Sequence, residues 1–170
     1  MPPLIAEPKP EILIEKAQRQ LSLYRGDHLF FRCPIGLGFT PQGHKTREGD
    51  GCTPEGHYLI CTRNPESKFY LALGLNYPNA ADALAALAEG RISQKEAAEI
   101  IAAEQAGQRP PWDTPLGGQI MIHGQRPWQK PGQEYLAGSD WTAGCISLAN
   151  DDMERLWQLC PLGTPVQILP

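Results

Sequence analysis

His123 and Cys145 are the two residues whose types and surroundings could support covalent chemistry. An apolar run over 120–122 ends in His123-Gly124, and Cys145 stands between Gly144 and a second apolar residue. A thiol becomes an effective nucleophile when an adjacent imidazole removes its proton, provided that the fold brings the two side chains together. Because most cysteines and histidines in a chain have structural roles, the spacing alone leaves a buried Cys145 and a hydrogen-bonded His123 as an open alternative.

Gly144 strengthens the catalytic interpretation. A free thiol has a pKa of about 8.5, so it needs a basic neighbour or backbone N–H dipoles to react at neutral pH. Without a Cβ, Gly144 allows a tight turn in which its own N–H and that of Cys145 point at a developing oxyanion. The nucleophile and the oxyanion hole are therefore expected in the same turn.

The elements that must position these residues are predicted to form one β-rich domain. A chain of 170 residues with Gly 17 and Pro 17 contains many turns and is long enough for a single core. Residues 1–11 are expected to form a tail and 12–170 the domain. Runs at 12–25 and 28–35 flank Gly26-Asp27 and predict a β-hairpin. Its expected core positions are Leu21, Leu23, Phe30 and Ile35, with Cys33 as a small buried side chain.

A glycine-rich loop follows over 36–55, and it lacks the Gly-Lys-Ser/Thr pattern of a phosphate-binding loop. Further strands are predicted at 57–62, 69–77, 119–123 and 166–169.

Residues 80–106 interrupt the strands with a helical hairpin. They are rich in Ala, Glu, Leu and Ile and contain no proline. One helix is expected over 82–88, and Ser93 with Glu96 forms a capping-box pattern that begins a second helix ending near 105. The hairpin could be a lid over a cleft or a cover for the sheet. A C-terminal helix over 153–159 is predicted after Asn150-Asp151-Asp152, which supply the cap and the first-turn acids.

Composition argues against several other classes of function. The net charge is −4 and no basic stripe is present, so nucleic-acid binding is not expected. The apolar runs are too short for a transmembrane segment. No secretory signal is visible in residues 1–10, so export is expected either by another route or through a signal that these residues do not include. The five cysteines are odd in number and have no CxxC spacing, which disfavours a disulfide framework. A zinc site could be imagined from four residues but lacks paired-ligand spacing: Cys52, Cys61, His44 and His57.

The motif around the two candidate catalytic residues resembles that of a known family. His123-Gly124, a loop over 125–141, and the run Thr142-Ala143-Gly144-Cys145-Ile146 are similar to the signature of the YkuD-type L,D-transpeptidase catalytic domain. The Asp-Trp-Thr-x-Gly-Cys form of the motif, at 140–145, resembles one branch of that family. Other landmarks that resemble the family are Gly38, Lys45, Gly49-Asp50, Thr53 to Tyr58, Leu116 to Gly118 and Gly163 to Val166.

The resemblance implies a β-rich, mainly antiparallel, sandwich-like fold and a mechanism without metal or cofactor. Cys145 would be the nucleophile, His123 the base and then the acid, and the Gly124 carbonyl the group that orients the imidazole. The N–H groups of Gly144 and Cys145 would hold the oxyanion. Candidate substrate contacts are Tyr58, Tyr77, Arg126, Trp141, Thr142 and Ser147. Tyr58, Asn76, Tyr77, Trp128 and Trp141 fit a cleft, and a place in the core or at the rim is the equal alternative for each. Arg126 or Lys130 could supply a contact to the substrate carboxylate.

Two departures from the family pattern leave the reaction outcome open. Ala143 stands where many members have His, and Ser147 where many have Arg or Asn. The implied substrate is a peptidoglycan stem peptide, whose thioester could pass to an acceptor amine or a wall-attached protein. Transfer to water would instead make the protein an L,D-carboxypeptidase or amidase. A non-catalytic peptidoglycan-binding module is the third alternative.

The resemblance also implies a place of action. A monomer in the cell envelope or periplasm is expected, and an exported antibacterial effector is the alternative.

Overall fold

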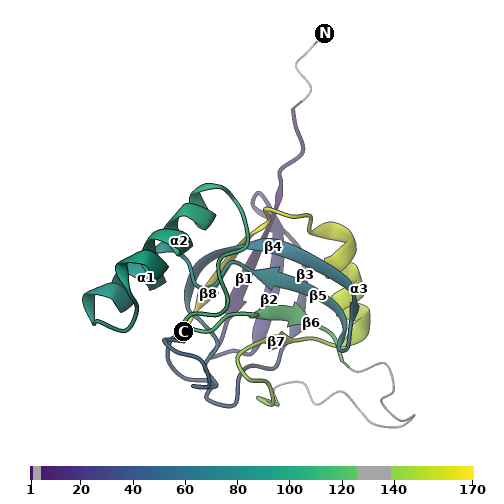
Figure 1. Ribbon diagram of the computed structural model, residues 1–170. Helices are drawn as coiled ribbons and strands as arrows, with labels where there is room; N and C mark the ends of the chain where they lie inside the picture. The colour runs from purple at the N-terminus through teal and green to yellow at the C-terminus, as the bar shows by residue number, and fades with distance from the viewer. Residues whose placement is uncertain (2–4, 126–138) are drawn as a thin grey trace.

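A single curled sheet forms the body of the protein. The computed structural model describes residues 1, 5–125 and 139–170, and within these ranges it contains eight strands and three helices (Figure 1). The strands lie in the order β3-β2-β1-β8-β4-β5-β6-β7. Their bounds are β1 (Pro10–Glu15), β2 (Gln20–Arg25), β3 (His28–Pro34), β4 (Gly56–Ser67), β5 (Tyr70–Leu75), β6 (Met121–His123), β7 (Ile146–Ser147) and β8 (Pro165–Leu169).

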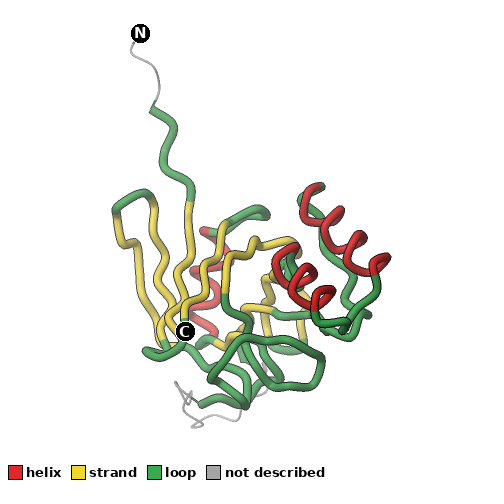
Figure 2. The backbone as a smooth tube through the Cα atoms, turned by 90° about the vertical axis from the view of Figure 1, so that its left-hand side faces the viewer, coloured by secondary structure: helices red, strands yellow, loops and turns green. Residues whose placement is uncertain are grey.

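The long strand β4 joins the two halves of this sheet. Its first residues, from Gly56 to Leu59, pair with β8, and the remainder, from Ile60 to Ser67, pairs with β5. The pairs β1–β8 and β6–β7 are parallel and the other pairs are antiparallel. The sheet curls into a half-barrel around a core rich in Ile and Leu (Figure 2). The prediction of a β-rich, mainly antiparallel fold is confirmed.

The N-terminal region differs from its prediction in two ways. The run over 12–25 is two strands, because the chain turns between Glu15 and Gln20 before β2 pairs with β3 as the expected hairpin. A β-bulge lies between Leu23 and Tyr24, which pair with Phe31 and Leu29 respectively and so leave Phe30 as the extra residue. The core assignment of Phe30 is therefore wrong: Phe30 is 46% exposed and Phe31 7% exposed. Leu21, Leu23, Cys33 and Ile35 are buried as predicted.

The helical hairpin predicted over 80–106 is confirmed as α1 (Ala80–Ala88) and α2 (Gln94–Gln105). Both helices begin with a complete capping box, Asn79 with Asp82 and Ser93 with Glu96, each of which satisfies two otherwise unpaired N–H groups. The hairpin lies beside β4, on the opposite side of the molecule from α3 (Figures 1 and 2). Because Glu104 of α2 lines a cavity over the neighbouring strands, both the lid and the cover stay predictions.

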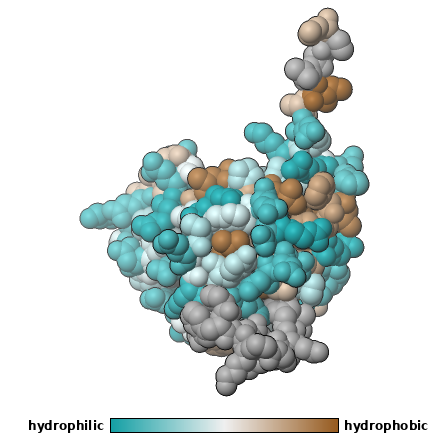
Figure 3. Space-filling model, turned by 90° about the vertical axis from the view of Figure 1, so that its right-hand side faces the viewer, coloured by the Kyte–Doolittle hydropathy of each residue, from teal (hydrophilic) through white to brown (hydrophobic). Residues whose placement is uncertain are grey.

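The C-terminal helix α3 (Asn150–Leu159) begins earlier than predicted. Its N-cap is Ala149, without a side-chain hydrogen bond, so the assignment of Asn150 as a cap is wrong. Asp151 and Asp152 do occupy the first turn, where their charges suit the helix dipole. The side of the molecule that carries α3 is mostly hydrophilic with separate apolar patches, as expected for a helix with one buried face (Figure 3).

Residues 5–9, just before β1, run away from the sheet (Figure 1). Strand β1 starts at Pro10, two residues before the predicted start of the domain. In the described part of the chain no helix is long and apolar enough to cross a membrane.

Candidate active site

The parallel pair β6–β7 places His123 and Cys145 on neighbouring segments. Ile122 pairs with Ile146 and His123 with Ser147, so Cys145 lies two residues before the partner of His123. The backbone of Gly36 in turn bonds both the N–H and the carbonyl of Ser147, at 3.0 and 2.9 Å. Strand β7 is thus held from both sides although it is short.

The imidazole of His123 is held in one tautomer. Its Nδ1 lies 2.7 Å from the carbonyl oxygen of Gly124, and a carbonyl can only accept, so Nδ1 carries the proton. Nε2 of the neutral ring is then a free base. Burial lowers the pKa of His123, and the Gly124 bond opposes this only in part. The ring is therefore neutral, with Nε2 able to accept a proton, at neutral pH.

Two aromatic side chains enclose the imidazole. Phe69 stacks on it with ring centroids 4.6 Å apart and planes at 19°, and Trp141 meets it edge-on at 5.7 Å. Phe69 and Trp141 also contact each other, at 5.6 Å. His123 is consequently buried although Trp141 itself is 42% exposed.

The thiol of Cys145 is partly buried and lies against the backbone that leads into β6. Its Sγ accepts a hydrogen bond from the N–H of Met121 at 3.3 Å and donates to the carbonyl of Gln119 at 3.4 Å. Burial raises the pKa of Cys145, while the Met121 amide and the charge of Lys45 oppose that rise. The resting state is therefore a protonated thiol that needs a base.

Thr142 organises the turn before the thiol. Its Oγ1 donates to the carbonyl of Cys145 at 2.7 Å and accepts from the N–H of Gly144 at 3.1 Å. Gly144 has a φ of 137°, and a Cβ there would lie 2.7 Å from the carbonyl oxygen of Cys52. The turn requires glycine, as the sequence suggested. The N–H of Gly144 is occupied by Thr142, however, so the structure does not support it as an oxyanion donor.

A buried ion pair lies in the loop beside this turn. Lys45 Nζ is 2.9 Å from Asp50 Oδ1, and both side chains are nearly inaccessible. Burial would raise the pKa of Asp50, but the bonds from Lys45 and from three backbone amides outweigh it and lower that pKa. The pair fixes the segment whose Cys52 carbonyl packs against Gly144.

Most of the predicted substrate contacts are interior residues. Tyr58 donates to Asp82 at 2.9 Å and Tyr77 donates to the carbonyl of Leu116 at 2.9 Å, so both hydroxyls already have partners. The side chains of Thr142 and Ser147 are buried as well. All four are buried, although Tyr58 also lines a cavity, and their role as substrate contacts stays a prediction. Asn76 is likewise buried, with its Oδ1 accepting from Leu59.

Among the predicted contacts that the structure describes, Trp141 alone combines an exposed surface with a position beside His123. The remaining candidates, Arg126, Trp128 and Lys130, lie outside the described residues. Two residues not predicted as part of the site lie close to it: Phe69 stacks on His123, and Asn150 accepts a bond from the N–H of Gln125. Phe69 comes from the β4–β5 turn, and no local pattern in the sequence links it to His123.

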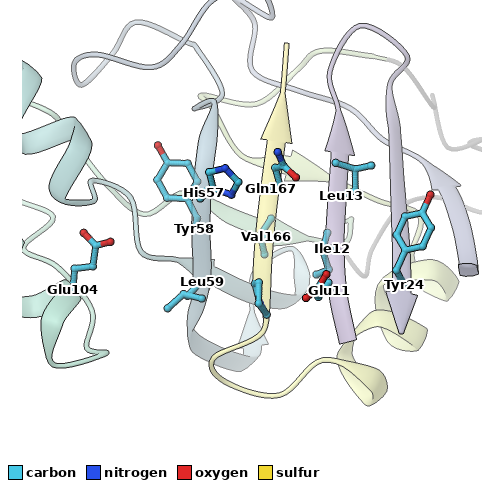
Figure 4. A pocket seen from close by; sticks show the side chains of 11 residues that line it. Glu11, Ile12, Leu13, Tyr24, His57, Tyr58, Leu59, Glu104, Val166 and Gln167 are labelled. Carbon is cyan, nitrogen blue, oxygen red and sulfur yellow. The ribbon is translucent and has the colours of Figure 1, made fainter. Parts of the chain in front are cut away.

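A cavity of about 600 Å³ lies elsewhere, over β2, β1, β8 and β4 and next to α2 (Figure 4). Leu13, His57 and Gln167 line it together with Glu104, and it includes neither His123 nor Cys145. No group of three or more metal-ligating side chains occurs in residues 5–125 and 139–170. His44 instead bonds the amide of Glu55 and the carboxylate of Asp82, each at 2.7 Å.

The curled sheet thus places the segments that carry His123 and Cys145 next to each other. The family model described as YkuD, L,D-transpeptidase catalytic domain, matches residues 9–168, so the chain belongs to this family. No curated protein sequence matches the chain.

Solved structures with a similar fold include proteins from three bacteria. The helical cell shape determining protein Pgp2 from Campylobacter jejuni shares 25% identity with a TM-score of 0.62, over 94% of this chain and 47% of that one. Bd1075 from Bdellovibrio bacteriovorus shares 24% identity with a TM-score of 0.58, over 96% and 49%. An L,D-transpeptidase from Xylanimonas cellulosilytica shares 13% with a TM-score of 0.53, over 99% and 64%. The chain spans about half the length of the first two proteins.

Proposed function

We propose that this protein is a cysteine-dependent peptidoglycan L,D-transpeptidase that acts on tetrapeptide stems through a thioester. The observation that carries the proposal is the 2.7 Å contact between His123 Nδ1 and the Gly124 carbonyl, which leaves Nε2 as the basic nitrogen. The strand register supports it, since it puts the thiol on the segment next to this imidazole. Family membership supports the substrate class, because L,D-transpeptidases act on peptidoglycan stem peptides.

In the proposed first half-reaction Cys145 attacks the carbonyl at the L-centre of the third stem residue. The thiol proton passes to Nε2 of His123 as the C–S bond forms, and the carbonyl becomes an oxyanion. The Gly124 carbonyl stabilises the imidazolium through Nδ1–H. When the tetrahedral intermediate collapses, Nε2–H protonates the nitrogen of the departing D-Ala, and a thioester to Cys145 remains.

In the second half-reaction an acceptor amine attacks the thioester. Its proton goes to Nε2, the new amide bond forms, and the thiolate leaves and is reprotonated by His123. The Met121 N–H already bonds Sγ, so it would stabilise sulfur when it carries negative charge. Because the N–H of Gly144 already donates to Thr142, we propose that the N–H of Cys145 donates to the oxyanion.

Trp141, which is partly exposed beside His123, would contact the bound substrate.

Residues 12–170 would act as one catalytic domain and as a monomer in the cell envelope or periplasm. The Campylobacter jejuni protein is named as a determinant of helical cell shape, and a contribution to cell shape is proposed here by similarity.

Product analysis with a disaccharide tetrapeptide tests this function. With an acceptor amine, we expect release of D-Ala and a crosslinked product from the wild-type protein. Tripeptide as the sole product would identify the L,D-carboxypeptidase alternative. Cys145→Ala should abolish both products, whereas Cys61→Ala, a matched change at another partly buried cysteine, should leave them unchanged. Turnover retained by Cys145→Ala would contradict the proposal, and no turnover by correctly folded wild-type protein would favour a binding module.

A further inference from the structure

The peptide group between Gly124 and Gln125 is bonded by side chains at both ends. Its carbonyl oxygen lies 2.7 Å from His123 Nδ1, and its N–H donates to Asn150 Oδ1, also at 2.7 Å. The peptide group is planar, so two bonds at its opposite ends fix its orientation. The direction of the carbonyl that holds the imidazole therefore depends on Asn150.

The side chain of Asn150 does not cap the helix in which it lies. Asparagine is among the preferred residues at a helix N-cap, where its oxygen accepts from the first-turn amides. In α3 the N-cap is Ala149, with no side-chain bond, and Asn150 is already inside the helix. Its side-chain oxygen instead accepts a hydrogen bond from the N–H of Gln125, in the segment after β6. A residue that departs from local preference in this way points to a role elsewhere in the structure.

The approach of Asn150 also accounts for the glycine that precedes the bonded amide. A Cβ on Gly124 would lie 2.5 Å from Asn150 Oδ1 and 3.2 Å from the carbonyl oxygen of Phe69. The Gly124 N–H meanwhile donates to the carbonyl of Leu71 at 3.2 Å, which ties the segment to β5. Gly124 is thus fixed by β5 on one side and by Asn150 on the other.

We propose that Asn150 is a positioning residue for His123 and acts through the Gly124–Gln125 peptide group. Accepting a bond from the Gln125 N–H polarises that group and makes the Gly124 carbonyl a stronger acceptor. A stronger acceptor at Nδ1–H keeps the proton there, leaves Nε2 basic and stabilises the imidazolium. The effect of Asn150 on turnover rests on the proposed function. Its effect on the tautomer and pKa of His123 does not.

The test is an NMR titration of the His123 ring nitrogens in the wild-type protein, Asn150→Ala and Asn150→Asp. The alanine variant removes the acceptor, so the Nδ1–H tautomer should lose population and the His123 pKa should fall. The aspartate variant keeps an acceptor of nearly the same shape and adds negative charge, so the pKa should rise above that of the wild-type protein. Turnover should fall by about 10- to 100-fold in Asn150→Ala, as expected for a misplaced catalytic group. It should largely recover in Asn150→Asp.

The matched control is Asp151→Ala, which alters the same turn of α3 at an exposed side chain. It should lower the melting temperature without moving the His123 titration or the rate. The proposal is overturned if Asn150→Ala leaves the tautomer and pKa of His123 unchanged, whatever happens to its rate. If Asn150→Ala does not fold, a His123 pKa in Asn150→Asp equal to that of the wild-type protein is the overturning result. Failure of the cysteine mechanism would be seen separately, as turnover by Cys145→Ala.

Discussion

The ring of Phe69 lies face to face with the imidazole of His123, with centroids 4.6 Å apart and planes at 19°. Together with the bond from Nδ1 to Gly124, this stacking leaves the imidazole little freedom to rotate. It also excludes water from one face of the ring, which contributes to the burial that lowers the His123 pKa. Phe69 is therefore expected to affect catalysis without contacting the reacting atoms.

Phe69→Leu should reduce turnover more than it reduces stability. Leucine retains much of the buried apolar area but cannot stack, so the imidazole should sample other orientations, and kcat should fall by roughly 10-fold or more. Steady-state kinetics and thermal unfolding would be measured side by side. Phe30→Leu makes the same change at an exposed position and is the control. Equal rates for the two variants would contradict this role.

The pH dependence of kcat/KM should reflect a neutral His–thiol pair. The pKa of His123 lies below its ordinary value of 6.5, so the base should become active with a midpoint below pH 6.5. Burial raises the pKa of Cys145 above that of an ordinary thiol, so the thiol should stay protonated through neutral pH. Iodoacetamide should therefore alkylate Cys145 slowly at pH 6 and faster as the pH approaches 9. Rapid alkylation at pH 6 would instead indicate a thiolate–imidazolium pair at rest.

Lys45→Met should destabilise the fold strongly. It would leave Asp50 buried without its cation, a loss of about 3–5 kcal/mol for a buried pair. Because the pKa of Asp50 is lowered in the folded state, its stabilising contribution is present above the ordinary value of 3.8. That contribution is lost as the pH falls through the lowered pKa. Urea unfolding at pH 7 would measure the loss. Lys95→Met, at an exposed position on α2, should change stability by less than about 1 kcal/mol. A similar loss in both variants would argue against a special role for the buried pair.

Gly144→Ala should cost more stability than a glycine substitution that only strains the backbone. The new Cβ would lie 2.7 Å from the Cys52 carbonyl oxygen, in addition to the strain of a φ of 137°. Gly90→Ala provides the comparison, since Gly90 has a φ of 71° and open space around it. That control is expected to cost about 1 kcal/mol, and Gly144→Ala clearly more. Equal shifts in melting temperature would show that the loop carrying Cys52 can move away.

The sequence was informative where local patterns determine structure. The alternation of apolar residues, the turn glycines and the Ser93–Glu96 capping box predicted the strands and the α1–α2 hairpin, because these signals act within a few residues. The motif around His123 and Cys145 predicted the family and the segments of the candidate site. Phe30 was misassigned because a bulge depends on pairing between strands and has no clear signal within one strand.

The sequence does not reveal which side chains form hydrogen bonds with residues far away in the chain. The bonds from the hydroxyls of Tyr58 and Tyr77 to Asp82 and Leu116 are of this kind. Asn150 looked like a helix cap because the local preference is strong, yet its oxygen bonds Gln125. Contacts of this kind depend on how strands and helices meet, and residues far apart in the chain supply them.

The most direct test of the central claim is detection of the acyl-enzyme itself. Wild-type protein would be mixed with the disaccharide tetrapeptide, quenched in acid within the first turnovers and digested for peptide mapping by mass spectrometry. We predict that the peptide containing Cys145 carries the disaccharide tripeptide as a thioester, and that Cys61→Ala gives the same adduct while Cys145→Ala gives none. Turnover with the acyl group on another residue, or product formed by Cys145→Ala, would contradict the assignment of Cys145 as the nucleophile.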